Sequence, residues 1–281
     1  ARPYWGERER EVERRGVNII FAIDISKSMR AQDVGETPLR RDNGTTYNRL
    51  EHAKQLVRQI LAETPGHRVG IMPFAGEAFL QCPLTTDYGI AQDVVRQVDF
   101  ATVSLQGTNI PLMIESATEA FERSGEGTRA LVVLTDGENH SGEIVDAAEE
   151  AADEGIRIYA LGIGTRDGAP VVMPDGTYLE DKQGHKVLSQ LNPELVSDLA
   201  AETGGKAYMA GASGVLDPSP IIRDLQELER SELGPEKRIV REERYQWPLV
   251  LALLCLMTEM LLHDRRRAGK RRNTLVPTTA Q

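Results

Sequence analysis

Short apolar runs alternate with longer amphipathic stretches between residues 17 and 209. The run at residues 18–24 is rich in Ile and carries few polar side chains, which is typical of a strand buried on both faces of a parallel sheet. Strands are predicted over residues 18–24, 68–74, 78–82, 130–136, 156–163 and 206–209, and helices over residues 48–63, 89–98, 111–123, 143–154 and 193–203. This alternation predicts an α/β fold with a doubly wound, mostly parallel sheet and helices on both of its faces.

Two loops and one hairpin modify this plan inside a domain that we predict over residues 17–214. Gly76 lies in the short gap between the second and third predicted strands, which indicates a hairpin and therefore one antiparallel edge strand. Residues 29–47 form a long polar loop at the ligand end of the sheet, where a functional loop and an ordinary surface loop fit equally well. Residues 165–190 carry the turn residues of one or two hairpins, and we expect them to decorate the sheet edge.

The composition changes after residue 214. We predict a charged amphipathic juxtamembrane helix over residues 215–244 and a transmembrane helix over residues 245–263, close to the ~20 residues that a bilayer helix needs. Tyr245 and Trp247 are typical of a membrane–water interface, although a buried core helix is an alternative for the same pattern. A basic tail over residues 264–281 follows, and the positive-inside rule places it in the cytoplasm and the globular domain outside.

The negative charge of the 281-residue chain argues against nucleic acids as partners. The formal net charge is −10, whereas nucleic-acid binding requires a basic face. Cys82 follows a strand-like run and Cys255 lies in an apolar stretch, so we expect two buried free thiols rather than a disulfide bond.

Oxygen-bearing side chains leave the first predicted strand at alternate positions. Asp24, Ser26 and Ser28 follow the apolar run directly, and ligands of open α/β sheets bind outside the carboxyl ends of the strands. A carboxylate and two hydroxyls suit a small, hard cation such as Mg²⁺, which usually keeps some coordination positions filled by water.

Two further segments place oxygen donors at the same end of the predicted sheet. Thr108 precedes a predicted helix, where capping of that helix is the alternative role, and Asp136 ends another strand, where a turn residue before glycine is the alternative. The predicted metal ligands are therefore Asp24, Ser26, Ser28, Thr108 and Asp136, with Mg²⁺ as the expected cation and Mn²⁺ as a second possibility.

These five positions resemble the metal-ion-dependent adhesion site (MIDAS) of von Willebrand factor A (VWA) domains. The resemblance covers residues 17–209 and implies a Rossmann-like fold with one antiparallel edge strand. In that family the serines and the threonine bind a divalent cation directly or through water, the aspartates lie in the inner or second shell, and a carboxylate of a partner protein fills the open coordination position.

A narrower resemblance to the bacterial Bat aerotolerance proteins, BatB-like members in particular, rests on residues 74–85, residues 135–140 and the Trp-led apolar run. It implies an inner-membrane protein with a periplasmic adhesion-type domain, other Bat-type membrane proteins as partners, and an association with a MoxR-type AAA ATPase system in stress tolerance or envelope assembly. Bat proteins usually carry hydrophobic helices before the domain. We therefore expect residues 1–16 to be a charged lead-in that follows a membrane segment upstream of Ala1.

The leading functional prediction is a non-enzymatic binding module that captures a partner's carboxylate through the cation. A Mg²⁺-dependent phosphatase or hydrolase is the first alternative, but Ser26 occupies the place where haloacid-dehalogenase-type enzymes need a second Asp, and neither serine lies in a G-x-S-x-G elbow. The second alternative is a structural subunit whose metal only stabilises the fold.

Overall fold

The computed structural model describes residues 4–10, 16–35, 47–125, 127–138, 144–232, 238–243 and 249–259. Residues 14–234 form one compact unit, and residues 1–13 together with 235–281 form a second. The first unit contains a six-stranded sheet in the order β4 (Cys82–Thr85), β3 (Arg68–Phe74), β2 (Asn18–Asp24), β5 (Arg129–Thr135), β6 (Ile156–Gly162) and β9 (Ala207–Met209). All neighbouring strands run parallel except β3 and β4, which pair antiparallel at one edge.

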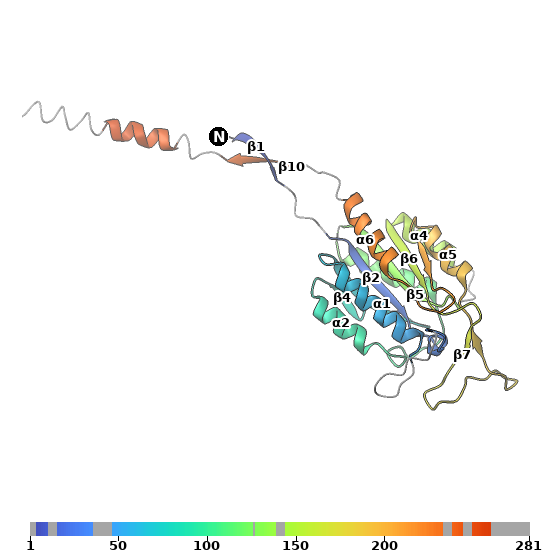
Figure 1. Cartoon of the computed structure of the whole chain (residues 1–281). Coiled ribbons are helices and arrows are strands. Elements are labelled where there is room, and N and C mark those ends of the chain that lie inside the picture. Colours follow the sequence, from blue (N-terminus) through green and yellow to red (C-terminus); the bar gives the residue numbers. More distant parts are fainter. Residues whose placement is uncertain are drawn as a thin grey trace, which may run out of the picture. The chain divides into compact units, whose positions relative to one another are not determined.

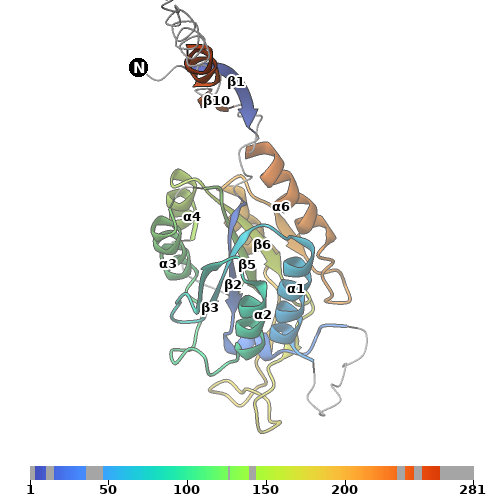
Figure 2. The ribbon, with the colours of Figure 1, turned by 90° about the vertical axis from the view of Figure 1, so that its left-hand side faces the viewer.

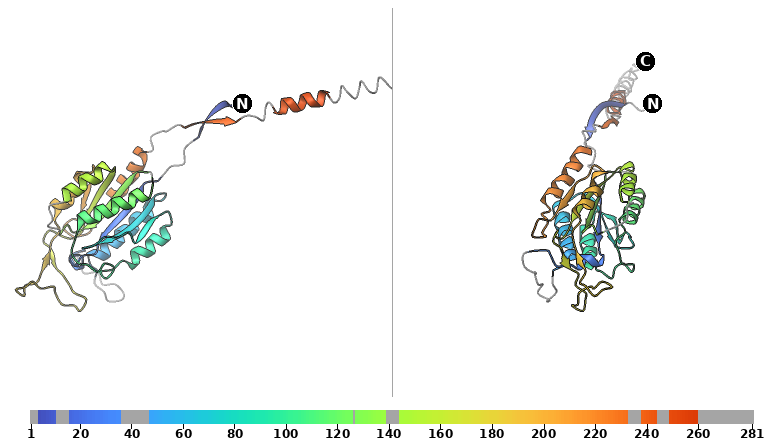
Figure 3. Two further views of the ribbon diagram at one scale, coloured as in Figure 1. Left: turned by 180° about the vertical axis from the view of Figure 1, so that it is seen from behind. Right: turned by 90° about the vertical axis from the view of Figure 1, so that its right-hand side faces the viewer.

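Helices cover both faces of this sheet (Figures 1 and 2). One face packs against α1 (Arg49–Glu63), α2 (Tyr88–Gln97) and α6 (Ser219–Glu232), and the view from behind shows the helices of the other face (Figure 3). That second face packs against α3 (Ile110–Arg123), α4 (Ile144–Asp153) and α5 (Pro193–Ala201). Successive side chains of β2 point to opposite faces and every residue of the strand is buried, because the strand is central and covered on both sides.

The predicted doubly wound sheet with an antiparallel edge strand is confirmed, and the predicted helices differ from α1 to α5 by two residues or fewer at each end. The edge strand itself was predicted too early, over residues 78–82, whereas β4 spans Cys82–Thr85. Ala78 forms only an isolated bridge with Phe74, and Phe79 is 42% exposed. Ala78 and Leu80 of the apolar run that favoured a strand there pack against the core, but the ladder with β3 begins only at Cys82.

The insertion after β6 contains the short strands β7 (Ala169–Pro170) and β8 (Leu188–Ser189), paired antiparallel. Isolated bridges join Val172 to Tyr178 and Glu180 to Lys186, as hairpins require. The insertion leaves from a strand inside the sheet and lies at the end where β2 stops (Figure 2), so its expected position at the sheet edge was wrong.

The predicted charged helix over residues 215–244 is also corrected. α6 ends at Glu232, and β10 (Arg238–Glu243) is a strand that pairs antiparallel with β1 (Tyr4–Arg10) in the second unit. Ile221, Leu225 and Leu228 of α6 are buried in the core of the first unit, so this helix is part of the globular domain. Gly234 and Pro235 in the sequence explain the division, because both residue types oppose helix formation.

The predicted transmembrane segment is described only in part. Residues 249–259 are helical, while residues 245–248 and 260–263 lie outside the described residues. Within the described ranges, no helix is long and apolar enough to cross a membrane. Cys82 is a buried free thiol as expected, whereas Cys255, on this short helix, is free but exposed.

Candidate metal site

The carboxylate of Asp24 lies fully buried at the carboxyl end of β2. Its Oδ1 accepts a hydrogen bond from the backbone N–H of Ser26 at 2.8 Å, and its Oδ2 accepts one from Thr135 Oγ1 at 2.7 Å. Ile25 N–H donates to Phe74 O at 2.8 Å, which continues the pairing with β3 just beyond the strand end. The carboxylate is thereby fixed between two neighbouring strands.

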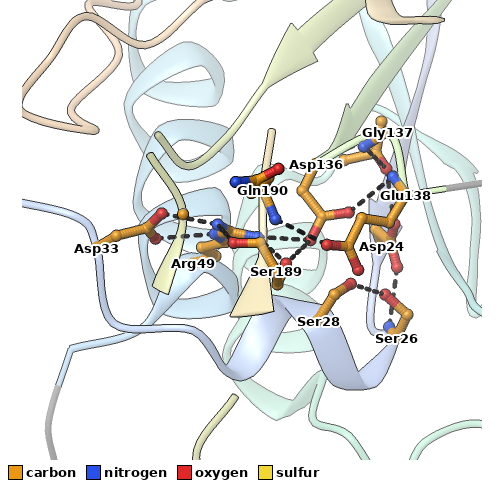
Figure 4. A network of polar contacts seen from close by, with 12 residues as sticks. Asp24, Ser26, Ser28, Asp33, Arg49, Asp136, Gly137, Glu138, Ser189 and Gln190 are labelled. Atoms are coloured by element: carbon orange, nitrogen blue, oxygen red, sulfur yellow. Dashed lines mark hydrogen bonds and ion pairs between the residues drawn. The ribbon is translucent and has the colours of Figure 1, made fainter. Parts of the chain in front are cut away.

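The two predicted serine ligands lie at a short 3₁₀ helix, η1 (Lys27–Arg30), that follows β2. The hydroxyl oxygens of Ser26 and Ser28 are 2.8 Å apart, both side chains are buried, and Figure 4 shows them beside Asp24. Met29 of the same 3₁₀ helix is fully buried in the core and so anchors this turn to the domain. The predicted grouping of one carboxylate and two hydroxyls is therefore present.

The end of β5 brings the second carboxylate into the same cluster. Asp136 is fully buried; its Oδ1 accepts from Glu138 N–H at 3.2 Å and its Oδ2 accepts from Arg49 Nη1 at 2.8 Å (Figure 4). Gly137 follows with φ +72°, a conformation that favours glycine, and a Cβ there would lie 3.0 Å from Asn192 O. The chain turns sharply at this point, and the Asp136 side chain lies against Arg49 and Ser189.

Arg49 at the start of α1 is the largest fully buried side chain in the described part of the chain. Its Nε and Nη2 donate to the two carboxylate oxygens of Asp33 at 2.8 and 2.7 Å, and its Nη1 forms the ion pair with Asp136. Ser189 accepts from the same guanidinium with both its hydroxyl and its backbone oxygen. Arg49 therefore connects three segments at this end of the sheet.

Asp33 also ties the insertion after β6 to the cluster. Its Oδ2 accepts from both the backbone N–H and the hydroxyl of Thr165, each at 2.9 Å. Burial alone would raise the pKa of Asp33, but the hydrogen bonds and charge of Arg49 outweigh it and hold the pKa below its ordinary value. Residues 33, 165 and 189 thus attach the start of the long loop and both ends of the insertion to the cluster around Asp24 and Asp136. Residues 36–46 of that loop lie outside the described residues.

The charges in this cluster do not cancel. Burial, and secondly the nearby charge of Asp136, raises the pKa of Asp24 to about 7. The cluster holds three carboxylates with little or no exposure, those of Asp24, Asp33 and Asp136, and one positive charge, that of Arg49. With Asp24 ionised, these groups would sum to −3 + 1 = −2. A buried site with this excess of carboxylate oxygens and two adjacent hydroxyls fits a hard divalent cation.

Thr108 is placed near the cluster through its backbone neighbours. Asn109 N–H donates to Ala75 O at 2.8 Å, directly after β3, and Asn109 Oδ1 caps α3 by accepting from Leu112 N–H at 3.1 Å. Asn109 thus takes the capping role that was the alternative for this segment. No hydrogen bond in the described part of the chain joins the Thr108 side chain to Asp24 or the serines, so its role as a ligand stays a prediction.

No group of three or more His, Cys, Asp or Glu side chains suited to a metal ion occurs among the described residues. The predicted site does not need one, because three of its five donors are hydroxyls. Sequence reasoning missed Arg49, Asp33 and Ser189. An Arg in the first turn of an amphipathic helix is ordinarily solvated, and nothing in the local pattern distinguishes this one.

The sequence model of the von Willebrand factor type A domain matches residues 18–174, more than half of the 281 residues. BatB from Bacteroides thetaiotaomicron is 34% identical, with a TM-score of 0.68, over 76% of this chain and 100% of that protein's solved chain. The chain belongs to the VWA family and, within it, to the Bat aerotolerance group. An aerotolerance-related membrane protein from Bacteroides fragilis is 32% identical, with a TM-score of 0.66, over 77% of this chain and 100% of that chain.

A UPF0353 protein from Mycolicibacterium paratuberculosis is 30% identical over 213 residues. The alignment covers 72% of this chain and 58% of that relative. The VWA chain therefore spans less than two thirds of the length of this curated relative.

Proposed function

We propose that this VWA domain is a metal-dependent protein-binding module. Asp24, Ser26, Ser28, Thr108 and Asp136 hold a divalent cation, Mg²⁺ or Mn²⁺, and a carboxylate of a partner protein completes its coordination. When bound, the cation supplies a Lewis-acidic position that a carboxylate oxygen occupies in place of water. The proposal gives the domain a role in capture, not in catalysis.

The observation that carries the proposal is the uncompensated buried charge around Asp24. Two fully buried aspartates point into one cluster, and only one of them is paired with Arg49. Burying an ionised carboxylate without a positive partner is strongly unfavourable, which is why the pKa of Asp24 rises to about 7. A divalent cation beside the serine hydroxyls would remove this penalty.

The protein's own groups determine which ligand the site accepts. Asp24 is held by Ser26 N–H and Thr135 Oγ1, so its carboxylate is oriented before a cation arrives. Ser26 and Ser28 offer neutral oxygens, which leave more of a cation's positive charge uncompensated than carboxylates would. Such a site favours an anionic oxygen from outside, as on an exposed Asp or Glu of a partner.

A capture experiment tests the proposal. The full chain is immobilised and exposed to detergent-solubilised membranes of the source bacterium, with Mg²⁺ or with a chelator, beside Asp24→Ala and the control Asp153→Ala. Asp153 is exposed at the end of α4, so its loss removes a charge without touching the cluster. We expect Mg²⁺-dependent capture by the wild type and Asp153→Ala but not by Asp24→Ala. Capture that survives chelation, or that Asp24→Ala retains, contradicts the proposal.

The same variants separate the two alternatives. Mg²⁺-dependent phosphatase or esterase turnover that disappears in Asp24→Ala would indicate an enzyme. Metal that raises the melting temperature without any metal-dependent capture would indicate a structural cation.

We propose in addition that residues 245–263 anchor the chain in the bacterial inner membrane, with the VWA domain in the periplasm and the tail in the cytoplasm. Support comes from seven large apolar side chains in residues 249–257, each 53–67% exposed, and from the membrane-protein description of the Bacteroides fragilis neighbour. Other Bat-type membrane proteins and a MoxR-type ATPase system are the proposed sources of the captured carboxylate.

A further inference from the structure

Arg49 is a buried cation whose every N–H is used. Its five donors make five hydrogen bonds, to both carboxylate oxygens of Asp33, to one of Asp136, and to the hydroxyl and backbone oxygens of Ser189. The side chain is 0% exposed, so no solvent shares in its stabilisation. Its charge therefore acts on the neighbouring carboxylates at short range and with little screening.

The backbone at Gly164 packs closely against the Arg49 guanidinium. Gly164 has φ +114°, and a Cβ there would lie 2.5 to 2.8 Å from three atoms of the Arg49 guanidinium. The arginine is held on one side by this glycine and on the other by Asp33, Ser189 and Asp136. It cannot swing away from Asp136 without breaking several bonds at once.

We infer that Arg49 is the positioning residue that sets the charge of the metal site: it neutralises Asp136, so that a bound divalent cation keeps enough positive charge to attract a partner's carboxylate. This inference rests on the proposed function and adds to it a residue outside the five predicted ligands. Asp33 binds the guanidinium from the opposite side to Asp136. Its negative charge offsets part of the positive charge of Arg49 and so weakens the neutralisation of Asp136.

A role of Arg49 in setting the charge of the site can be distinguished by experiment from a merely structural role. Removing the positive charge of Arg49 leaves Asp136 uncompensated, which makes the cluster more attractive to a cation and less attractive to an added carboxylate. The two affinities therefore move in opposite directions. If Arg49 only held the loops together, its loss would loosen the site and weaken both.

The test compares purified wild-type chain with Arg49→Gln, Arg49→Lys and the control Arg123→Gln. Arg123 pairs with Glu119 on the exposed surface of α3, so its variant has the same net charge as Arg49→Gln without touching the cluster. Mn²⁺ affinity is measured by titration calorimetry, and acetate binding to the Mn²⁺-loaded chain by the fall in water-proton relaxation as a bound water is displaced.

For Arg49→Gln we expect Mn²⁺ to bind about tenfold more tightly and acetate several-fold more weakly than in the wild type. Its metal-free melting temperature should fall, because Asp33 and Asp136 lose their buried partner. Arg49→Lys keeps the positive charge but loses the planar, five-donor guanidinium. Its affinities for Mn²⁺ and acetate should therefore stay near those of the wild type, while its melting temperature falls. Arg123→Gln should change neither affinity.

Unchanged or weaker Mn²⁺ binding in a folded Arg49→Gln overturns the inference. If that variant does not fold, Asp33→Asn tests the inference, because it leaves Asp136 as the only carboxylate that forms an ion pair with Arg49. In this variant Mn²⁺ should bind more weakly and acetate more tightly than in the wild type. The reverse result, or no change in either affinity, overturns the inference. A wild type that binds no Mn²⁺ contradicts the proposed function itself. A wild type that binds Mn²⁺ and acetate while Arg49→Gln changes neither contradicts only the role of Arg49.

Discussion

Thr135 Oγ1 donates a hydrogen bond of 2.7 Å to Asp24 Oδ2, and so joins the ends of two neighbouring parallel strands, β5 and β2. Both residues are fully buried. The same hydroxyl accepts from Gly137 N–H at 3.0 Å, so one side chain orients the first carboxylate of the site and also holds the turn that carries Asp136. A residue outside the predicted ligand set therefore sets the spacing of the two acids.

Thr135→Val should destabilise the metal-free domain by about 1–2 kcal/mol, because it leaves the buried Asp24 carboxylate and Gly137 N–H short of one partner each. Urea unfolding measures this. Thr135→Ser, which keeps the hydroxyl, is the matched control and should lose less. Equal unfolding midpoints for the wild type and Thr135→Val would show that the bond does not hold the site together.

The fold was largely predictable because the central strands are buried on both faces, and such strands leave a continuous apolar run in the sequence. β4 was misplaced by several residues because its pairing depends on β3 and not on local hydrophobicity. β1 and β10 were missed for the same reason, since each is charged and pairs only with the other, at a distance of more than 200 residues along the chain.

Gly164→Ala should disturb the packing around Arg49, although Gly164 itself makes no polar side-chain contact. Its Cβ would collide with the Arg49 guanidinium, so we expect a lower melting temperature and altered Mn²⁺ affinity. Gly184→Ala is the control, because Gly184 also has a positive φ, +82°, but a Cβ there meets nothing within 4 Å. A Gly164→Ala variant that melts no lower than Gly184→Ala would contradict the crowded packing around Arg49.

The buried His52 should make the domain sensitive to mild acid. Its Nε2 accepts a hydrogen bond from Leu216 N–H at 3.1 Å, and burial lowers the pKa of His52 to about 4. The unfolded chain takes up the proton at its ordinary pKa of ~6.5, above the folded value, so protonation favours unfolding. The His52 contribution is complete above pH 6.5 and is lost between pH 6.5 and 4, by up to ~3 kcal/mol.

Urea unfolding of the wild type and His52→Gln at a series of pH values checks this. Gln keeps an acceptor for Leu216 N–H but does not titrate, so the difference in unfolding free energy between the two proteins should change between pH 6.5 and 4. A difference that is constant over this interval would show that His52 does not titrate as its burial requires.

The grouping of Asp24, Ser26, Ser28 and Asp136 was predictable, whereas their role as ligands stays a prediction. Parallel strands end at one edge of the sheet, so residues at their carboxyl ends meet there whatever their separation in sequence. Arg49, Asp33 and Ser189 were not predictable, because their partnership depends on how the loop after η1 and the insertion after β6 fold onto that edge. Each alone is an ordinary surface-type residue in the sequence.

The most direct test is the position of Mn²⁺ in crystals of the domain grown or soaked with this ion, located by anomalous diffraction. We expect one strong peak in contact with the hydroxyls of Ser26 and Ser28, with Thr108 and the carboxylates of Asp24 and Asp136 bound directly or through water. An absent peak, or a peak beside the serines with Thr108 or Asp136 too distant to share the ion, would contradict this expectation.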